Sequence, residues 1–216
     1  MMRTTNLLKT VMALVVCVLW AGQTVAQDLT PRLFWPAPKG TKLLVAGYSH
    51  ASGDVFFDRS LPLYGVDSDI NVGILAYVQT LGLWGRTSNF LVELPYTWGQ
   101  TKGFIGETPA RADFSDFGDL KFTLTLNLLG APSMTVDDFL AFRADPQPIV
   151  GASLKLVAPT GAYDSNKLIN VGANRWATRL QLGSVIPLRP TWLLELEGGV
   201  WFFGDDDEFL PGRREQ

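Results

Sequence analysis

The chain has 216 residues, enough for one domain with a sizeable core, and charged residues make up only 18% of it. The formal net charge is −3, and no run of Lys and Arg supplies the basic patch that binding to nucleic acid requires. Nucleic acid is therefore excluded as an expected partner.

The first 26 residues have the pattern of a secretory signal peptide. Arg3 and Lys9 supply the positive start, residues 14–21 ("LVVCVLWA") are apolar, and small residues precede a cleavage position after Ala26. The apolar run is about ten residues long, half of what a spanning helix needs, so an uncleaved anchor is the weaker alternative. The only cysteine, Cys17, lies in this segment, so residues 27–216 are expected to hold no disulfide and no cysteine-ligated metal.

Beyond residue 40, apolar and polar residues alternate with a period of two, which predicts β-strands. Each predicted strand is about ten residues long, closer to the strands of membrane barrels (about nine to eleven) than to soluble strands (about five or six). The seven predicted strands are residues 41–50, 69–80, 87–98, 118–129, 149–158, 176–186 and 191–203. Residues 134–144 ("MTVDDFLAFRA") are the best candidate for a short amphipathic helix, with a turn as the alternative.

The two faces of the predicted strands differ in polarity. One face is apolar, as with the leucines of residues 118–129, and the other carries charge of both signs. This alternation fits a membrane barrel with a polar lumen, and it fits equally a soluble sheet with a leucine core. We expect six charged residues to line the lumen of a barrel, with salt bridges between neighbouring strands as the alternative role. They are Lys121, Lys155, Arg179, Glu93, Glu195 and Glu197.

Aromatic residues favour the membrane alternative over a soluble core. Tyr96, Trp98, Trp192 and Phe202 lie on apolar faces near the ends of predicted strands, where rings anchor a barrel at the membrane interface. Trp192 and Phe202 are ten residues apart. At about 3.3 Å per residue and a tilt near 40°, this separation spans about 25 Å, the height of a lipid-facing band. Ordinary packing of aromatic residues in a core is the alternative.

The connections between predicted strands alternate in length, as in membrane barrels with short periplasmic turns and long outer loops. Long connections are predicted at residues 51–68, 99–117, 159–175 and from 204 onward, and short turns at 81–86 and 187–190; residues 130–148 are the exception. A membrane barrel must close and usually has an even number of strands. Seven strands followed by a polar segment therefore predict that residues 27–216 form a C-terminally truncated barrel domain, with a miscounted strand or closure by several copies as alternatives.

Catalytic and metal sites have little support in the sequence. His50 is the only histidine, and Ser49, Ser52 and Asp54 lie near it, but adjacent residues of a strand point to opposite faces, so a catalytic triad is not expected. The acidic segments 205–208 and 112–120 lack the ligand spacing of an EF-hand, so solvated loops are expected there. We predict no catalytic residue, no metal ligand and no cofactor.

Four segments resemble the MetA-pathway phenol-degradation family. They are "GDLKFTLTLNLL" (118–129), "GASLKLVAPTGAYDSN" (151–166), "NVGANRWATRLQLG" (170–183) and "WLLELEGGVWFFGDDDEF" (192–209). The most specific pieces are the "PTG" turn at 159–161 and the set Asn170, Gly172, Asn174 and Trp176. The resemblance covers residues 40–210 and implies an antiparallel up-and-down transmembrane β-barrel of the bacterial outer membrane, transporter-like rather than an enzyme.

The leading functional prediction is an outer-membrane channel that passes small hydrophobic or aromatic compounds such as phenolics, with the lipid bilayer as its partner. The first alternative is a structural or surface barrel that transports nothing and has a filled interior; the second is an envelope hydrolase. Strand number separates the first two, because about eight strands leave an interior filled by side chains whereas twelve or more leave room for a solute. No oligomeric state follows from the sequence.

Overall fold

The computed structural model describes residues 30–54, 63–167, 169–189 and 192–206. The predicted signal peptide, Cys17 and the acidic residues Asp207 and Glu208 lie outside the described residues. The chain divides into two units, Met1–Pro31 and Arg32–Gln216, and the description below concerns the second unit.

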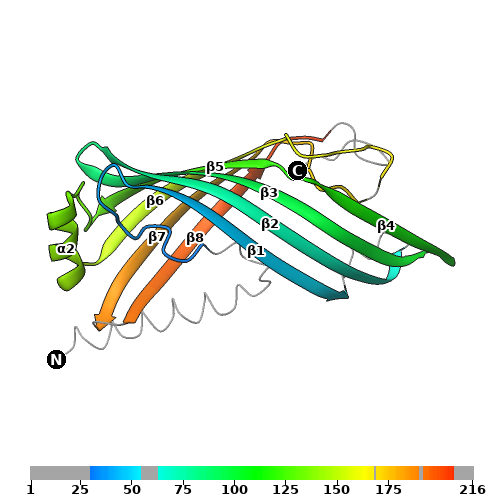
Figure 1. The fold of residues 1–216 in the computed structure, drawn as a ribbon, viewed down its shortest axis with the longest axis horizontal. Coiled ribbons are helices and arrows are strands. Elements are labelled where there is room, and N and C mark those ends of the chain that lie inside the picture. Colours follow the sequence, from blue (N-terminus) through cyan, green and yellow to red (C-terminus); the bar gives the residue numbers. More distant parts are fainter. Residues whose placement is uncertain (1–29, 55–62, 168, 190–191, 207–216) are drawn as a thin grey trace, which may run out of the picture. The chain divides into compact units, whose positions relative to one another are not determined.

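The second unit is an antiparallel sheet whose strands pair in chain order (Figure 1). Within the described ranges, seven strands follow the path β1-β2-β3-β5-β6-β7-β8, and β4 pairs with β3 beside that path. Their bounds are Lys42–Asp54 (β1), Leu63–Leu83 (β2), Arg86–Ile105 (β3), Thr108–Phe117 (β4), Leu120–Leu129 (β5), Ile149–Ala158 (β6), Ala177–Arg189 (β7) and Trp192–Phe203 (β8). The predicted all-β, antiparallel up-and-down fold is confirmed.

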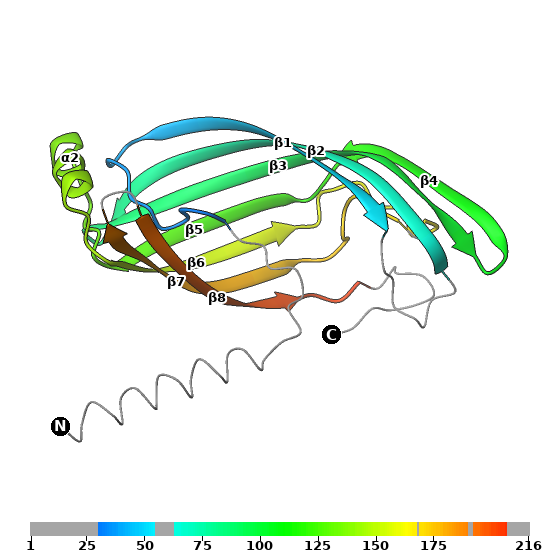
Figure 2. The same cartoon turned by 90° about the horizontal axis from the view of Figure 1, so that it is seen from below.

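Strands β2 and β3 are 21 and 20 residues long, well beyond the predicted ranges 69–80 and 87–98. The prediction of a long loop at 99–117 was wrong, because the end of β3 pairs with β4 there. The loop predicted at 51–68 was wrong at both of its ends, where β1 and β2 extend into the range, and residues 55–62 lie outside the described residues. At about 3.3 Å per residue, β3 is about 66 Å long, roughly twice the thickness of a bilayer core. The β3–β4 hairpin therefore extends past the ends of β5 to β8 (Figure 2).

Strands β4 and β5 lie end to end along β3. β5 pairs with Phe90–Glu93, whereas β4 pairs with Tyr96–Ile105. Gly118 and Asp119 separate the two strands opposite Pro95, whose carbonyl accepts a hydrogen bond of 2.9 Å from the Gly118 amide. Because proline has no N–H to donate, the ladder is interrupted at this position. The predicted strand 118–129 accordingly begins at Leu120.

The sheet curls (Figure 2), and the burial of its side chains shows that the concave face is the polar one. Leu154 and Leu180 on the convex face are 45% and 52% exposed, whereas their neighbours Lys155 and Arg179 on the concave face are 8% and 7% exposed. A soluble sheet with a leucine core would show the reverse. The buried polar residues of the concave face include Thr123, Thr125, Asn127, Ser153 and Gln181.

The end of the sheet that holds the β2–β3 turn and helix α2 (Val136–Ala144) is called the turn end; the end that holds the β3–β4 turn and residues 159–176 is called the loop end. Thr135 caps α2, and its hydroxyl and the Asp138 side chain form a capping box. This helix confirms the helical alternative for 134–144. No helix in the described part of the chain is long and apolar enough to cross a membrane.

A small apolar cluster lies at the turn end. Its buried members are Phe34, Ala131, Met134, Ile149 and Val185. Helix α2 adds two phenylalanines to this cluster, and the Phe142 ring meets the Trp35 ring edge-on at 5.8 Å. The long connection 130–148, which broke the predicted alternation of loop lengths, thus supplies part of the packing at this end.

Candidate functional site

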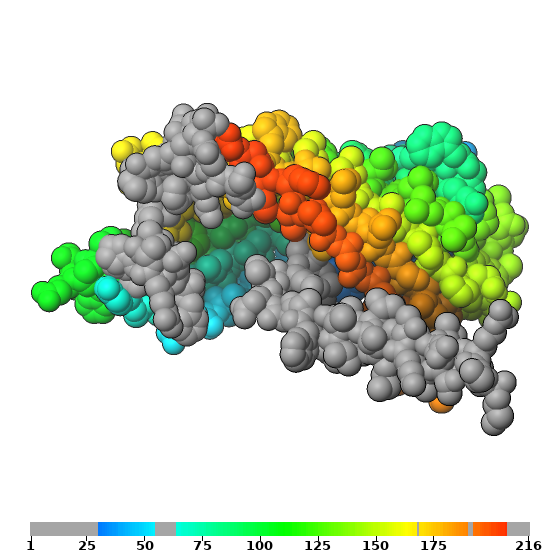
Figure 3. Space-filling model, turned by 180° about the vertical axis from the view of Figure 1, so that it is seen from behind, coloured from blue at the N-terminus to red at the C-terminus, as the bar shows by residue number. Residues whose placement is uncertain are grey.

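The hollow on the concave face, between β8 and the strands β1 to β3, is the candidate site (Figure 3). The strand register places all six predicted lumen residues on this face. Glu93 lies on β3, Lys121 on β5, Lys155 on β6, Arg179 on β7, and Glu195 and Glu197 on β8. Their role in selecting solutes stays a prediction.

Register sets four of the concave residues in one row across β5 to β8. Thr123, Lys155, Arg179 and Trp201 are successive cross-strand partners. Lys155 and Arg179 are therefore like charges on adjacent strands, an arrangement that destabilises a sheet. The Arg179 guanidinium lies over the Trp201 ring, with 5.7 Å between its Cζ and the ring centroid. Lys155 and Arg179 thus place two positive charges side by side on the concave face, between Thr123 and Trp201.

The predicted acidic residues have different partners from those expected. Glu93 and Lys121 are Cα partners, yet among the described ion pairs none joins their side chains. Glu197 accepts a hydrogen bond of 2.7 Å from the Gln181 Nε2 group. Glu195 accepts a hydrogen bond of 2.9 Å from the Arg32 backbone amide. The Glu93–Lys121 pair thus offers no support for the alternative of cross-strand salt bridges.

The part of the concave face formed by β1 and β2 is apolar. Ala76 is the register partner of Glu93, which fixes the inward face of β2. The inward residues there include Leu43 and Val45 on β1 and Val72, Ile74, Ala76 and Val78 on β2, with the polar Ser49 opposite Val72. The hollow therefore has one charged wall and one apolar wall. Sequence alternation did not reveal the apolar wall, because both faces of these two strands carry apolar residues.

Phe34 occupies the hollow at the turn end. Its side chain is 1% exposed and lies against Gly151 of β6 and Gly183 of β7, where a Cβ atom would overlap the ring. Asn127 donates a hydrogen bond of 3.0 Å from Nδ2 to the Phe34 carbonyl. Residues 32–36 thereby narrow the concave hollow. The sequence carried no signal for this segment, since it precedes the first strand and shows no periodicity.

Asp119 holds the connection 159–176 against the sheet at the loop end. Its two carboxylate oxygens accept hydrogen bonds of 2.8 Å each from the backbone amides of Gly161 and Ala173. Gly118, Gly161 and Gly172 approach one another so closely that a Cβ at Gly161 would lie 2.7 Å from the Gly118 carbonyl carbon. This contact explains the glycine of the "PTG" turn. The expectation of a solvated loop at 112–120 was wrong, because most of this range is strand β4 and Asp119 is buried.

Asp206 secures the same connection from the other side. It is 3% exposed and accepts hydrogen bonds from the Tyr163 hydroxyl at 3.2 Å and from Asn174 Nδ2 at 3.1 Å. The expectation of a solvated acidic run at 205–208 was therefore wrong at this residue. Among the described residues, no group of three or more His, Cys, Asp and Glu side chains is arranged to hold a metal ion.

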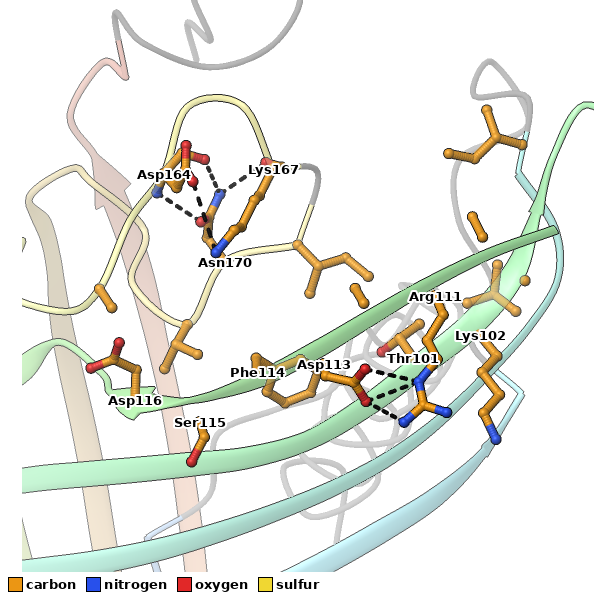
Figure 4. Close-up of a pocket in the computed structure, with 18 of the residues that line it drawn as sticks. Thr101, Lys102, Arg111, Asp113, Phe114, Ser115, Asp116, Asp164, Lys167 and Asn170 are labelled. Atoms are coloured by element: carbon orange, nitrogen blue, oxygen red, sulfur yellow. Dashed lines mark hydrogen bonds and ion pairs between the residues drawn. The ribbon is translucent and has the colours of Figure 1, made fainter. Parts of the chain in front are cut away.

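A cavity of about 650 Å³ lies at the loop end, between the β3–β4 hairpin and residues 162–171 (Figure 4). Phe114 lines it together with an ion pair of 2.6 Å between Arg111 and Asp113. On the loop side, Asp164 accepts a hydrogen bond of 2.9 Å from the Asn166 amide, which lowers the pKa of the Asp164 carboxyl below its usual value of 3.8. The cavity walls thus combine apolar side chains with charged ones, of which two sets form ion pairs, Arg111 with Asp113 and Lys167 with Asp164.

The predicted interface aromatics lie on the convex face, in two arrangements. Trp192 and Phe202 are 67% and 55% exposed at opposite ends of β8. Tyr96 and Trp98 lie in the middle of β3, so their predicted position at a strand end was wrong. They belong instead to a chain of ring contacts that runs from Tyr48 through Trp98 and Tyr96 to Phe117.

His50 lies on the edge strand β1 and contacts neither nearby serine. Its Nδ1 atom is 3.1 Å from Asn71 Oδ1 and 3.8 Å from Asp69 Oδ1. Ser49 faces the other side of the strand, and the described hydrogen bonds include none from His50 to Ser52 or Asp54. The structure does not bring these residues together as a triad.

Comparison with known proteins gives two matches. A family model described as "Putative MetA-pathway of phenol degradation" matches residues 49–214. The fold is similar to a solved structure described as the COG4313 outer membrane channel from Pseudomonas putida F1, with a TM-score of 0.61 and 23% sequence identity. The match covers 84% of this chain but 63% of that one, so this chain spans less than two thirds of its length. No curated protein matches the chain.

Proposed function

Since this chain belongs to the MetA-pathway phenol-degradation family, we propose that it is part of an outer-membrane β-barrel channel for small hydrophobic or aromatic solutes, phenolics among them. In this proposal residues 1–26 are the export signal, and β1 to β8 contribute to the barrel wall. Within the described residues, β1 and β8 are each hydrogen-bonded on one edge only. Because a sheet in lipid must pair every backbone group, further strands or another chain would close the barrel.

The inverted polarity of the sheet carries the proposal. Large apolar side chains cover the convex face of β5 to β8, including Leu124, Leu154, Leu180, Leu182, Leu196 and Val200, each between 38% and 62% exposed. Soluble monomers rarely expose contiguous apolar patches beyond a few hundred Å². In a membrane, lipid would cover these exposed apolar side chains, because a membrane barrel turns its apolar residues outward and encloses the polar ones.

Aromatic residues at both ends of the convex face support the same placement. Trp84 and Trp192 are 85% and 67% exposed at the turn end, and Trp176 and Phe202 are 53% and 55% exposed at the loop end. Amphipathic rings are favoured at the level of the headgroups, at both surfaces of a membrane. Two such groups on one apolar face are the arrangement of aromatic girdles.

The two walls of the hollow support the proposed class of solute. Charged residues such as Lys155 and Arg179 would contact polar groups of a passing molecule, while the wall that includes Val45 and Ile74 would contact its apolar part. A channel selects by the groups that line it. A wall of each kind suits a small molecule with an apolar body and a polar group, as in a phenol.

The alternative of a structural barrel with a filled interior has one specific observation in its favour. Phe34 and the apolar cluster around it occupy the concave face at the turn end. Side chains fill the interior of small barrels in general. Transport therefore requires that residues 32–36 leave a passage or move.

Electrical recording from the purified protein in planar lipid bilayers tests the proposal. We expect stepwise ion conductance, and we expect Lys121→Glu and Lys155→Glu to shift the reversal potential in a KCl gradient toward cation selectivity. Liposome swelling with phenol, compared with a sugar of larger size, then tests the solute class. Absence of conductance together with normal folding would favour the filled barrel, and unchanged selectivity in both variants would remove these lysines from the lumen.

A further inference from the structure

We propose that the cavity at the loop end binds a small uncharged phenol, whose ring lies against Phe114 of β4 and whose hydroxyl donates a hydrogen bond to the Asp116 carboxylate. This inference deepens the proposed function, because it gives one class of solute a site built from named residues. It rests on that function in taking the concave face to be the surface that solutes reach, whereas binding itself is measured without transport.

The first observation is the space. The cavity between the β3–β4 hairpin and residues 162–171 has a volume of about 650 Å³, within the range of about 300–1,000 Å³ typical of pockets for small molecules (Figure 4). On the sheet side, the strand register sets Thr101 opposite Ala112 and Gly103 opposite Ala110, and all four line the cavity. Because these side chains are short, they leave the space beneath the loop unfilled.

The second observation is that Phe114 and Asp116 share one face of β4. Their Cα partners on β3 are Gly99 and Thr97, which lie on the same, concave face as Glu93. Residues two apart on a strand are separated by about 6.6 Å, at about 3.3 Å per residue. A phenol that packs its ring on Phe114 therefore brings its hydroxyl within hydrogen-bond reach of the Asp116 carboxylate. Gly99, opposite Phe114, has no side chain to cover the flank of the aromatic ring.

The third observation is that other polar groups around the cavity already have partners within the chain. The Thr101 hydroxyl lies 2.9 Å from the Ser68 hydroxyl, the Tyr163 hydroxyl donates a hydrogen bond to a carboxylate, and the Asn170 amide group donates to two carbonyls of its own loop. Asp116 differs from them. Its Oδ1 atom accepts a hydrogen bond of 2.9 Å from the next amide along the chain, and among the described residues no hydrogen bond or ion pair engages its Oδ2 atom. A carboxylate only accepts, so the ligand that it binds must donate.

The balance of charges around the cavity indicates an uncharged ligand. The described lining residues include three basic side chains and three acidic ones, and two of each form the ion pairs Arg111–Asp113 and Lys167–Asp164. A lining without net charge favours neither an anion nor a cation, and an anion would also be repelled by Asp116. A phenol is uncharged near neutral pH, because a phenolic hydroxyl has a pKa of about 10.

Calorimetric titration of phenol into the full chain folded in detergent, with the heat of a titration into empty micelles subtracted, tests the site. We expect Asp116→Ala to weaken phenol binding by about tenfold or more, the effect of one hydrogen bond to a charged group. Asp116→Asn retains an acceptor oxygen and should weaken binding less than the alanine variant does. Phe114→Ala should weaken binding by about threefold or more, since it removes the ring contact.

Two matched controls make the same chemical changes on the convex face at the loop end. Asp67→Ala removes a carboxylate from β2, and Phe117→Ala removes a phenylalanine ring from β4; neither residue lines the cavity, so both variants should bind phenol as the unmodified chain does. Ala112→Phe tests the site without removing a polar group. It fills the cavity from the sheet side and should abolish phenol binding, which keeps the test decisive if Phe114→Ala does not fold.

Four comparison ligands separate the hydroxyl, the ring and the charge. Anisole has the ring and the oxygen without a hydrogen to donate, cyclohexanol has the hydroxyl without an aromatic ring, and benzoate and benzylamine add a negative or a positive charge. All four should bind more weakly than phenol. Binding of anisole or cyclohexanol equal to that of phenol, tighter binding of either charged ligand, or phenol binding that survives both Asp116→Ala and Ala112→Phe would overturn the inference.

Conductance recordings keep this test apart from that of the channel. A protein that conducts ions but binds phenol no better than anisole remains a channel and lacks the site. A protein that binds phenol in the expected pattern but conducts nothing has the site at the loop end and is not an open channel.

Discussion

Replacement of Phe34 by alanine, alone and together with Gly151→Ala, tests whether residues 32–36 occupy the hollow of the sheet. Phe34 is 1% exposed, and the loss of a buried phenylalanine side chain lowers the free energy of unfolding by about 3–5 kcal/mol. A Cβ at Gly151 would lie 2.9 Å from the Phe34 Cγ atom, so Gly151→Ala forces the ring to move. Overpacking of this kind costs about 1–3 kcal/mol.

The two substitutions should not be additive, because the new methyl group enters the space that the lost ring leaves. We expect Gly151→Ala to be nearly neutral in the Phe34→Ala background, which corresponds to a coupling energy of about 1–3 kcal/mol. Equilibrium unfolding in urea, with the protein in lipid vesicles or detergent, measures all four variants of the cycle. Conductance of the Phe34→Ala variant should rise, since the ring narrows the turn end.

Gly198→Ala is the matched control for Gly151→Ala. It makes the same chemical change in strand β8, where an added Cβ would have no atom within 4 Å. We expect its effect on unfolding to be independent of residue 34. If Gly151→Ala lowers the free energy of unfolding equally in the presence of Phe34 and in the Phe34→Ala background, the ring does not occupy the space beside Gly151 and Gly183.

Three further outcomes follow from the described contacts. Asp119→Asn removes the charge that two loop amides bond, so the thermal midpoint should fall by a change equivalent to about 2 kcal/mol and limited proteolysis should cut residues 159–176 faster; unchanged cleavage would contradict the clamp. Leu180→Lys should reduce folding into vesicles by about 2–4 kcal/mol, whereas Gln181→Lys on the concave face should not, and equal effects would remove the assignment of the faces. Hydrogen bonds from Thr135 lower the pKa of Asp138 below its usual 3.8, so the stabilisation of α2 by this carboxylate is complete above pH 3.8 and is lost as the pH falls through the lowered pKa. Hydrogen exchange of the α2 amides should therefore become faster as the pH falls through this range, once the intrinsic pH dependence of exchange is subtracted, and Asp138→Asn should remove this pH dependence.

Period-two alternation was enough to predict the fold class and the seven strands of the main path, because β5 to β8 have one apolar and one polar face throughout. It could not predict the length of β2 and β3. Residues 99–117 are rich in glycine and charge, and Thr101 is the one described residue of this range that is buried, so no buried face imposes an apolar pattern there. For this reason alternation predicts loops where β4 and the ends of its neighbours lie.

Alternation in the sequence predicts which face of a strand a single residue of the candidate site lies on. Lys155 and Arg179 were placed on the polar face from alternation alone, and their direct pairing became visible only with the register. Contacts between distant segments left no local pattern. The space that receives the Phe34 ring is formed by Gly151 on β6 and Gly183 on β7. Asp119 accepts hydrogen bonds from amides 42 and 54 residues further along the chain.

The central claim is that the convex face of this sheet lies in lipid and the concave face in water. Spin labels attached to single cysteines at Leu154 and Ser153 test it on neighbouring positions of β6, because residues 27–216 contain no other cysteine. In vesicles, collisions with oxygen should dominate at residue 154, and collisions with a water-soluble nickel chelate should dominate at residue 153. The reverse order, or equal access of the chelate to both labels, would contradict the account.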